Sequence, residues 1–517
     1  MQEFIFDNFY NIIERNSNYS PNKTVIFEEE LKISNKAFKS YVDNIAGFLT
    51  SLEIKPGNKV ALIMSNSWQY VVNIFAISKI GAIVVPLNSF FKSDELTYVL
   101  NDVQAELLFS SDKFKLETKE LLIKTNIKKI VWIGECPIEN ERNIDYAKII
   151  KKEFLIERAY DSKLDDTAFI LYTSGTTGKP KGAELTFRNI FSNCEGSKKL
   201  MDVRDGQIKM ICYLPMFHAF TLTATVILPI YSNSGIVVIR SISSKSDFKK
   251  VLKHLLLKRC QYFAGVPDIF NAMSKAKLPW YFHWFHNVKG FISGAAPLSD
   301  ETTNRFNKSF KRGTLLQGYG ITECSPIVSC GSPSENRLGS VGKALLDYQV
   351  RVFDDNMCEL PIGEVGEICV KGDCVMKGYY NRPEDTKTVI VDGWFKTGDI
   401  GRIDADGYIY IVDRKKDLII HKGMNIYPRE IEEVLYINEK VNACAAIGII
   451  DHEGSEVPIV YVELREGKTA TEVEIKDFIK PHLATFKQPR RVYFLEKLPR
   501  NATGKILKRE LREIGKN

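Results

Sequence analysis

Short apolar runs alternate with longer amphipathic stretches along the first part of the chain. Residues 59–66 predict a strand and a turn, residues 67–80 an apolar helix that ends at Gly81, and residues 82–88 a further buried strand. The alternation continues with predicted strands at residues 106–111, 129–134 and 168–172, and with segments predicted as a strand followed by a loop at residues 235–240, 261–267 and 288–299. Strands that alternate with helices in this way indicate a parallel sheet.

The pattern differs at the two ends of the chain. Residues 1–22 place apolar side chains at helical spacing, which predicts a helix docked on the body. From Val341 onward, alternating strands and glycine-rich turns predict a small antiparallel β-subdomain. A charged run interrupts two apolar β-runs within residues 408–420, and we expect a domain boundary there. Residues 417–517 predict a compact α+β unit with capped, amphipathic helices.

Composition narrows the class of protein. With 517 residues the chain is too long for one compact core, so two or more domains are expected. A hydrophobic fraction of 44% and a charged fraction of 26% are those of an ordinary globular protein. The net charge of +7 suits an anionic ligand, and without a concentrated basic arm no nucleic-acid partner is expected.

Compartment and membrane topology follow from three local patterns. The ten cysteines include no C-x-x-C pair, which disfavours structural zinc and favours free thiols. Glu3 and Asp7 interrupt the apolar core that a secretory signal would need, so we expect a cytoplasmic protein. Residues 211–239 carry no acidic or basic side chain, but Pro215 and Pro229 cut the stretch, which favours buried core over a membrane span.

The strongest chemical motif is LYTSGTTGKPKG at residues 171–182. Glycines let backbone N–H groups turn toward an anion, the hydroxyls add donors, and Lys179 and Lys181 add positive charge. The motif therefore predicts a phosphate cradle after the strand at residues 168–172, with Thr186 as the N-cap of a following helix. Thr173 and Pro180 stand where a Walker loop needs glycine and Ser/Thr, so that class of NTPase is disfavoured.

A second motif, LLQGYGITECSP, spans residues 315–326. Tyr319 is suited to stack on a base, Gly318 and Gly320 permit close approach of the backbone, and Glu323 offers a carboxylate to Mg²⁺ beside the Thr322 hydroxyl. Elsewhere, small residues at Gly294, Ala295 and Ala296 would let a flat ring approach a strand end. Asp399 is suited to accept hydrogen bonds from both hydroxyls of a ribose.

TSGTTGKPKG resembles the phosphate loop of the adenylate-forming enzymes, which include acyl-CoA synthetases, peptide-synthetase adenylation domains and firefly-type luciferases. The resemblance extends over residues 24–511 and rests on motifs in a fixed order. It implies ATP, Mg²⁺ and CoA as cofactor and co-substrates. It also implies that the loop residues bind ATP phosphates: Thr173, Ser174, Gly175, Thr176, Thr177, Gly178, Lys179 and Lys181.

The resemblance implies a role for further residues of this chain. Residues near the nucleotide would be Gly294, Ala295, Ala296, Gln317, Gly318, Tyr319, Gly320, Asp399 and Arg414. Phe217 and His218 in LPMFH would border the carboxylate, and Lys422 and Gly423 in HKGMNIYP would line the path of CoA. The catalytic set would be Lys505, Thr322, Glu323 and His218, with His218 orienting the substrate rather than transferring a proton.

The resemblance also completes the expected fold. It implies an α/β protein with a large N-terminal domain at residues 1–413, made of layered parallel-sheet subdomains plus a β-subdomain. A hinge at residues 414–416, with Lys416 as the pivot, would join it to a small mobile α+β domain at residues 417–517. One departure is Phe187, where the family often places histidine.

The motifs look most like those of medium- to long-chain fatty acid–CoA ligases, which implies a fatty acid substrate. An aryl- or coumarate-type CoA ligase would share every motif, and an acyl–carrier-protein ligase would differ only in its thiol. A luciferase-like oxygenase shares the adenylation step. A sensor without catalysis is disfavoured because Lys505, Glu323 and Asp399 occur together. A homodimer and peripheral contact with the inner membrane face stay open.

Overall fold

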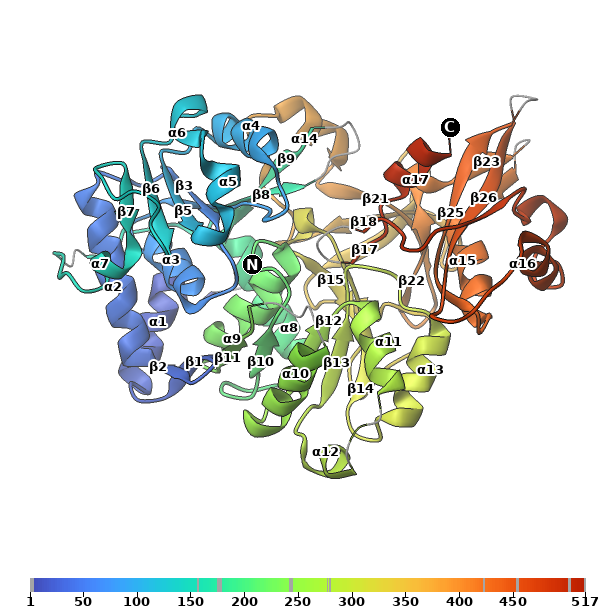
Figure 1. Ribbon diagram of the computed structural model, residues 1–517, viewed down its shortest axis with the longest axis horizontal. Helices are drawn as coiled ribbons and strands as arrows, with labels where there is room; N and C mark the ends of the chain where they lie inside the picture. Colours follow the sequence, from blue (N-terminus) through green and yellow to red (C-terminus); the bar gives the residue numbers. More distant parts are fainter. Residues whose placement is uncertain are drawn as a thin grey trace.

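The computed structural model describes residues 4–155, 158–173, 179–240, 245–276, 278, 280–421, 424–451, 455–500 and 504–515. The chain forms a large body that holds the N-terminal elements and a smaller C-terminal domain at one side of it (Figure 1). This arrangement confirms the predicted α/β class with a separate C-terminal domain.

One sheet of the body carries the predicted phosphate loop. Its strands are, in spatial order, β19 (Gly378–Tyr379), β9 (Lys181–Thr186), β8 (Thr167–Thr173), β4 (Ile83–Pro86), β3 (Lys59–Ile63), β5 (Leu107–Ser111), β6 (Lys129–Ile133) and β7 (Asn143–Asp145). The strands from β8 through β7 run parallel, as the alternating pattern predicts. β9 and β19 are antiparallel to their neighbours.

A second sheet lies beside the first. In spatial order its strands are β16 (Lys343–Ala344), β15 (Ile327–Cys330), β14 (Thr314–Gly320), β13 (Gly290–Ser293), β12 (Tyr262–Gly265), β10 (Met210–Cys212), β11 (Ile236–Val238), β1 (Thr24–Glu28) and β2 (Leu31–Ser34). The strands from β14 through β1 are parallel, so their carboxyl ends meet at one edge. Ligands bind at this edge in open α/β sheets.

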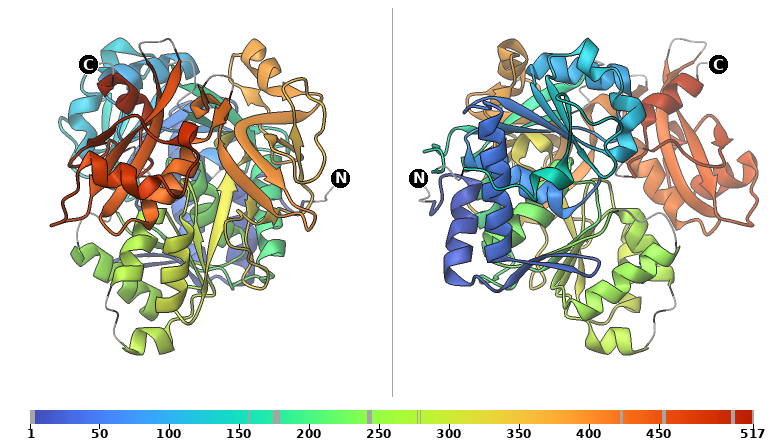
Figure 2. Two further views of the ribbon diagram at one scale, coloured as in Figure 1. Left: turned by 90° about the vertical axis from the view of Figure 1, so that its right-hand side faces the viewer. Right: turned by 60° about the vertical axis from the view of Figure 1, so that its left-hand side comes forward.

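Helices cover these sheets (Figure 2). They are α1 (Phe9–Tyr19), α2 (Asn35–Ser51), α3 (Trp68–Lys79), α4 (Ser93–Val103), α5 (Lys115–Thr118), α6 (Leu121–Lys124), α7 (Tyr146–Ile149), α8 (Phe187–Leu200), α9 (Leu228–Tyr231), α10 (Lys245–Leu257), α11 (Pro267–Lys275), α12 (Trp280–Phe285), α13 (Asp300–Ser309) and α14 (Pro383–Val389). As expected, α1 docks on the body, with Phe9 and Ile12 fully buried.

The phosphate loop connects two antiparallel strands. In the hairpin β8–β9, Thr173 pairs with Lys181. The sequence prediction of a helix capped by Thr186 is correct, because the Thr186 side chain accepts a hydrogen bond from the Asn189 N–H at the start of α8. The intervening strand β9 was missed, although Ala183 and Leu185 are buried on either side of the half-buried Glu184. That alternation is the pattern of a strand.

The β-subdomain is antiparallel, as predicted. It contains, in spatial order, β17 (Gln349–Phe353), β18 (Gly366–Lys371), β21 (Trp394–Ile403) and β20 (Ile390–Val391), and β22 (Ile409–Arg414) pairs with the later residues of β21, from Asp399 to Ile403. A 3₁₀ turn at Lys415–Asp417 follows β22 directly. This turn lies within the charged run at which the sequence predicts the domain boundary, and the boundary with its hinge stays a prediction.

The C-terminal domain has its own core. Its elements are β23 (Ile419–His421), β24 (Met424–Ile426), α15 (Pro428–Ile437), β25 (Val441–Ile450), β26 (Glu456–Leu464), α16 (Glu472–Ile479), β27 (Val492–Phe494) and α17 (Lys508–Ile514). Ile431, Val460 and Ile475 belong to one buried cluster between sheet and helices. Across the boundary, the Arg500 guanidinium lies 2.7 Å from the Asp268 carboxylate on α11.

The uncharged stretch at residues 211–239 is core. It contains β10, β11, α9 and a π-helical turn at Thr221–Ile227. Every residue of these four elements is buried. Pro229 cannot donate the backbone hydrogen bond of an α-helix, which is consistent with the wider turn before it. Among the residues that the structure describes, no helix is both long and apolar enough to cross a bilayer. The ten cysteines are free, as expected.

Candidate active site

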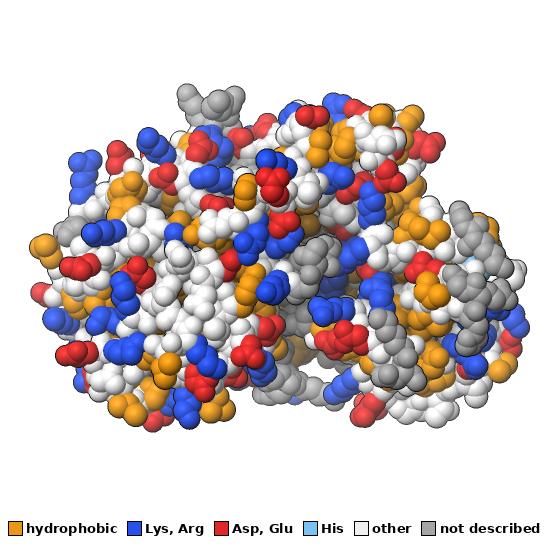
Figure 3. Space-filling view, turned by 90° about the horizontal axis from the view of Figure 1, so that it is seen from above, with side chains coloured by type: hydrophobic (Ala, Val, Ile, Leu, Met, Phe, Trp, Pro, Cys, Tyr) orange, Lys and Arg blue, Asp and Glu red, His pale blue; other side chains and the backbone are white. Residues whose placement is uncertain are grey.

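A cavity of about 1710 Å³ lies between the body and the C-terminal domain. Seen from above, Lys and Arg side chains gather along the groove between these two parts (Figure 3). The cavity wall includes many of the residues that the sequence selects: Thr173, Lys179, Lys181, Phe217, His218, Gly294, Ala295, Gly318, Tyr319, Gly320, Thr322, Glu323, Arg414, Lys416 and Lys505. Residues far apart in the sequence thus meet at one place.

Other predicted site residues lie elsewhere. Ala296, Gln317 and Asp399 are not part of the cavity wall, although each is next to a residue that is or contacts one. Ser174, Gly175, Thr176, Thr177 and Gly178 of the phosphate loop lie outside the described residues, and so do Lys422 and Gly423. The roles assigned to those seven residues stay predictions.

Lys505 reaches the cavity from the C-terminal domain. It follows Gly504, whose φ of +79° lies in the left-handed region that glycine adopts readily. Burial and the nearby Arg414 guanidinium lower the pKa of Lys505 to about 8, because both disfavour the ammonium form. A negatively charged phosphate at this position would restore the preference for the charged form.

Glu323 lies on the opposite wall, in the 3₁₀ turn Thr322–Cys324 after β14. Its carboxylate accepts hydrogen bonds from the Tyr379 hydroxyl at 2.9 Å and the Thr173 hydroxyl at 3.4 Å. Burial raises the pKa of Glu323, against the effect of these donors. Sequence reasoning missed Tyr379, because a tyrosine in the run VMKGYY carries no sign of its partner on another strand.

The predicted magnesium site is compatible with this geometry. The described residues contain no cluster of three or more His, Cys, Asp or Glu that would cage a metal ion. Mg²⁺ is usually bound by one or two carboxylates together with substrate phosphates and water, so a single carboxylate is sufficient. A cation would also offset the burial that disfavours ionised Glu323.

Asp399 forms a cluster with two predicted nucleotide residues. Its carboxylate accepts a hydrogen bond from the Tyr319 hydroxyl at 2.7 Å and lies 3.2 Å from the Arg414 guanidinium. Asp399 is buried on β21 and pairs across the sheet with Arg414 on β22. The β-subdomain therefore fixes the orientation of Tyr319 and Arg414 at the cavity wall.

His218 is neutral at physiological pH. Burial and the nearby Lys505 lower the pKa of His218 to about 4. Its Nδ1 atom accepts a long hydrogen bond from the Phe220 backbone N–H at 3.4 Å, which leaves the proton of the neutral ring on Nε2. A neutral donor of this kind is suited to orient a carboxylate rather than to transfer a proton.

The two loop lysines have different partners. The Lys181 ammonium lies 3.0 Å from the Asp385 carboxylate on α14, whereas the Lys179 ammonium lies 5.4 Å from the centre of the Tyr98 ring. Lys181 is therefore already neutralised by an acidic neighbour. Of the two, Lys179 has the charge that is available to an incoming phosphate.

Two glycines at the site permit close contacts. A Cβ atom at Gly320 would lie 1.9 Å from the Pro326 carbonyl oxygen, so only glycine fits there. A Cβ at Gly294 would lie 3.2 Å from the Phe220 ring, so the lack of a side chain at Gly294 makes room for that ring. Beside it, Ala295 has a φ of +67°, an uncommon conformation for alanine that is typical of functional sites.

One side of the cavity is apolar, and we call it the apolar arm. It lies between α8 and the second sheet and is lined by Leu200, Met201, Met210, Ala224, Leu228, Ile292, Ile327 and Leu345. These side chains come from helix, sheet and loop segments and share no sequence motif. The sequence motifs had pointed only to Phe217 and His218, as neighbours of the substrate carboxylate.

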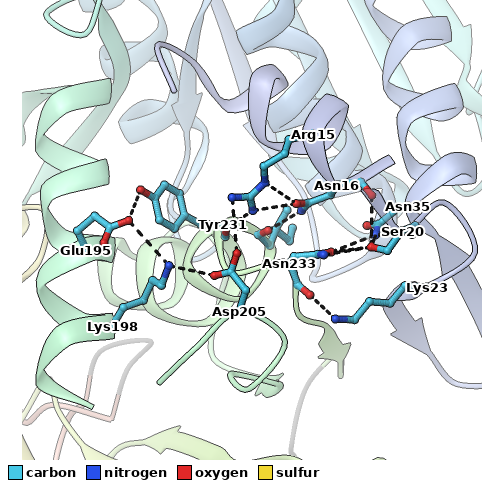
Figure 4. A network of polar contacts seen from close by, with 11 residues as sticks. Arg15, Asn16, Ser20, Lys23, Asn35, Glu195, Lys198, Asp205, Tyr231 and Asn233 are labelled. Carbon is cyan, nitrogen blue, oxygen red and sulfur yellow. Dashed lines mark hydrogen bonds and ion pairs between the residues drawn. The ribbon is translucent and has the colours of Figure 1, made fainter. Parts of the chain in front are cut away.

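A polar network holds two walls of the apolar arm together (Figure 4). The Tyr231 hydroxyl on α9 donates a 2.5 Å hydrogen bond to Glu195 on α8, and Lys198 on α8 lies 3.0 Å from Asp205. From α1, the Asn16 side-chain amide donates to the Ile230 carbonyl at 2.8 Å. These bonds fix α9 against α8 behind the side chains that line the arm.

Comparison with known families accounts for both parts of the chain. The family described as AMP-binding enzyme matches residues 13–380, and the family described as AMP-binding enzyme C-terminal domain matches residues 430–505. The residues between the two matches include Asp399, Arg414 and Lys416.

Individual relatives cover nearly the whole chain. The long-chain-fatty-acid–CoA ligase of Bacillus subtilis is 32% identical over 95% of this chain and 92% of its own length. The 4-coumarate–CoA ligase 1 of Petroselinum crispum is 31% identical over 90% of this chain and 86% of its own length. Among solved structures, ATP-bound MatB from Rhodopseudomonas palustris has a TM-score of 0.90 at 28% identity and covers 99% of both chains.

Proposed function

Because the chain belongs to the AMP-binding enzyme family, we propose that it is an AMP-forming acid–CoA ligase that activates a medium- or long-chain fatty acid. ATP, Mg²⁺ and CoA are its cofactor and co-substrates. The observation that carries the proposal is a single cavity in which Lys505 and Glu323 adjoin an apolar arm. A carboxylate at the polar end and an alkyl chain in the arm would fill it.

The first step forms an acyl-adenylate. A carboxylate oxygen attacks the α-phosphorus of ATP, the bond to the β-phosphate oxygen breaks, and pyrophosphate leaves. Little covalent help is needed for phosphoryl chemistry of this kind, so positioned charges dominate the rate. Lys505 supplies a cation, Lys179 neutralises the leaving phosphates, and neutral His218 holds the carboxylate through Nε2.

Glu323 and Thr322 are the residues that would hold magnesium at the phosphates. When bound, Mg²⁺ neutralises phosphate charge that develops during transfer. The Tyr379 and Thr173 hydroxyls keep the Glu323 carboxylate in one orientation, since each donates a hydrogen bond to it.

The second step transfers the acyl group to CoA. The thiol sulfur attacks the acyl carbon, the bond to the AMP oxygen breaks, and the thiol proton is released. Lys505 has no function in this step and occupies space at the mixed anhydride. The C-terminal domain therefore rotates about Lys416, which removes Lys505 and brings residues 421–428 toward the cavity.

The substrate assignment rests on the apolar arm. Aliphatic and methionine side chains dominate its wall, which suits a flexible alkyl chain. Relatives named for a fatty acid and for coumarate match at nearly equal identity, so a coumarate-type or other aryl substrate is the alternative. A carrier-protein thiol in place of CoA is a further alternative. The proposal leaves a homodimer and a peripheral membrane contact open.

A substrate panel tests these assignments. The purified protein is incubated with Mg-ATP, CoA and octanoate, palmitate, oleate, benzoate or coumarate, and AMP, pyrophosphate and acyl-CoA are measured by mass spectrometry. We expect palmitoyl- or oleoyl-CoA with stoichiometric AMP. Aryl-CoA alone would retain the chemistry and overturn the fatty acid assignment. Acyl-AMP without a thioester would favour the carrier-protein alternative.

A further inference from the structure

The edge of the second sheet opposite the candidate site is strongly basic. β12, β13 and β14 start there side by side, since Tyr262 pairs with Gly290 and Gly290 with Thr314. Basic side chains precede each strand and also β10, and we call them the basic edge: Lys209, Lys258, Arg259, Lys289, Lys311 and Arg312. Backbone hydrogen bonds join Lys209 to Gln261 at 3.0 Å and Gln261 to Lys289 at 2.7 Å, so the row is continuous.

Ion-pair partners of the basic edge are lacking among the described residues. In the part of the chain that the structure describes, none of these six side chains forms an ion pair. Burial lowers the pKa of Lys209, and the like charges of Lys258 and Arg259 add to this effect. Uncompensated like charges in one row favour binding of an anionic surface.

Exposed apolar side chains flank the same edge. Trp284 and Phe285 on the short helix α12 are 65% and 63% exposed, and Leu257 next to Lys258 is 62% exposed. The Arg312 guanidinium donates a hydrogen bond to the Trp284 carbonyl and lies 6.0 Å from the centre of its ring. This contact ties α12 to the basic edge, and Figure 1 shows α12 projecting beyond the starts of these strands.

Aromatic side chains beside lysine and arginine are the composition of the membrane–water interface. A double-stranded nucleic acid would account for the charges but not for the exposed side chains of Leu257, Trp284 and Phe285. A lipid surface accounts for both observations.

We propose that the basic edge and α12 form a docking surface for a bilayer that contains anionic phospholipid. Trp284 and Phe285 insert at the level of the head groups, and the basic edge contacts their phosphates. The inference rests on the proposed function, in that docking would bring the ligase to a membrane-dissolved acid substrate. The surface lies away from the residues assigned to adenylation, so binding and chemistry are separable.

Vesicle sedimentation tests the proposal with the full-length protein. We expect it to pellet with phosphatidylcholine vesicles that contain phosphatidylglycerol and to stay in solution with phosphatidylcholine alone. The variant Arg259→Gln/Lys289→Gln/Lys311→Gln should bind about a hundredfold more weakly, since each basic residue at an anionic bilayer contributes about a fivefold factor. Trp284→Ser/Phe285→Ser should also reduce binding. High salt should weaken it, because the Debye length falls.

The matched control is Lys119→Gln/Lys151→Gln/Lys152→Gln, which removes three exposed charges from another part of the body and should bind like the unmodified protein. Equal binding of this control and the edge variant, no binding to anionic vesicles, or equal binding to neutral vesicles would overturn the proposal. Tighter binding of the protein to single-stranded DNA than to anionic vesicles would also overturn it.

A second measurement separates docking from catalysis. Pyrophosphate release with soluble octanoate and no vesicles should be the same in the edge variant and the unmodified protein. With palmitate presented in anionic vesicles, the edge variant should be slower. If the unmodified protein released pyrophosphate with neither octanoate nor palmitate, the proposed function would be refuted, whereas equal palmitate rates in the two proteins would refute only the docking surface.

Discussion

The polar end of the cavity and its apolar arm are built from different kinds of segment. Loops and strand ends supply the polar end, where Glu323 follows β14 and Lys505 follows a glycine turn. The apolar arm takes its side chains mainly from within elements, such as Leu200 on α8 and Ile292 on β13. The polar end is therefore specified by individual functional groups, whereas the arm is specified by the way elements pack.

This difference predicts how each region responds to substitution. A change at the polar end should alter one half-reaction and leave the choice of acid intact. A change in the apolar arm should alter the choice of acid and leave the chemistry intact. If a substitution in one region altered both a half-reaction and the choice of acid, it would contradict the division of the cavity into two functional regions.

The largest effect is expected for Lys505→Ala. Loss of one well-placed charge contact in the transition state costs about 10²–10³-fold in rate. ATP–pyrophosphate exchange should fall by that factor, whereas transfer of a supplied acyl-AMP to CoA should be unchanged. Equal losses in both assays would show that Lys505 is not specific to adenylation. Lys508→Ala serves as a comparison for folding, because Lys508 pairs with Glu432 at 2.8 Å inside the same domain.

Lys416→Pro should have the opposite selectivity. Proline is tolerated in the first turn of a helix, so the 3₁₀ turn Lys415–Asp417 and adenylation should persist. The fixed φ of proline hinders rotation, and misplacement of reacting groups by about 1 Å already costs about 10²-fold. The rate of thioester formation from supplied acyl-AMP should therefore fall about 10²-fold. A parallel loss of pyrophosphate exchange would count against a hinge at this residue.

Ala224→Phe tests the apolar arm. Ala224 is buried in the π-helical turn and lines the arm, so a phenyl ring would exclude part of a long acyl chain. Because each buried methylene contributes about 0.8 kcal/mol, exclusion of two methylenes should lower kcat/KM for palmitate roughly fifteenfold. Octanoate measured in the same preparation is the internal reference and should change little. Equal losses for the two acids would mean that the alkyl chain lies elsewhere.

The pH dependence of adenylation should report Lys505. Its pKa is about 8 in the absence of substrate, and the cationic form is the one that stabilises phosphate charge. The kcat/KM of adenylation should therefore be constant below pH 8 and fall about tenfold per pH unit above it. In Lys505→Arg the residual activity should not show this decline, because arginine stays protonated. An identical decline in that variant would assign the titration to another group.

The smallest effect is expected at the contact between the domains. Asp268→Asn removes the carboxylate that pairs with Arg500 across the two parts, while Glu463 within the C-terminal domain remains 3.4 Å from Arg500, so the C-terminal domain should loosen from the position seen here. An exposed ion pair contributes at most about 1 kcal/mol, so adenylation should slow by less than about fivefold. Glu301→Gln, which breaks the pair with Arg305 within the body, should leave the rate unchanged. A slower thioester step in Asp268→Asn would contradict the inference that this ion pair holds the C-terminal domain in the position for adenylation.

Much of the fold follows from the sequence pattern. β3 (Lys59–Ile63) lies within the strand and turn predicted at residues 59–66, and α3 (Trp68–Lys79) lies within the helix predicted at residues 67–80. β9 was missed because its alternation is short and directly follows the glycine-rich loop, where the sequence predicts no strand. Among the site residues, those with a functional group in a short motif, such as Thr173 and Glu323, could be selected directly.

The sequence by itself selected the candidate residues for the chemistry and determined much of the order in which strands and helices occur. A short loop rich in hydroxyls, glycines and lysines can be recognised in the sequence because its composition limits what its backbone can bind. Only the tertiary structure decided that Tyr379 donates to Glu323, that Lys181 pairs with Asp385, and that Met201 and Leu345 share one arm. Such contacts depend on the packing of distant segments, and side-chain pairing between them leaves no trace in spacing along one chain.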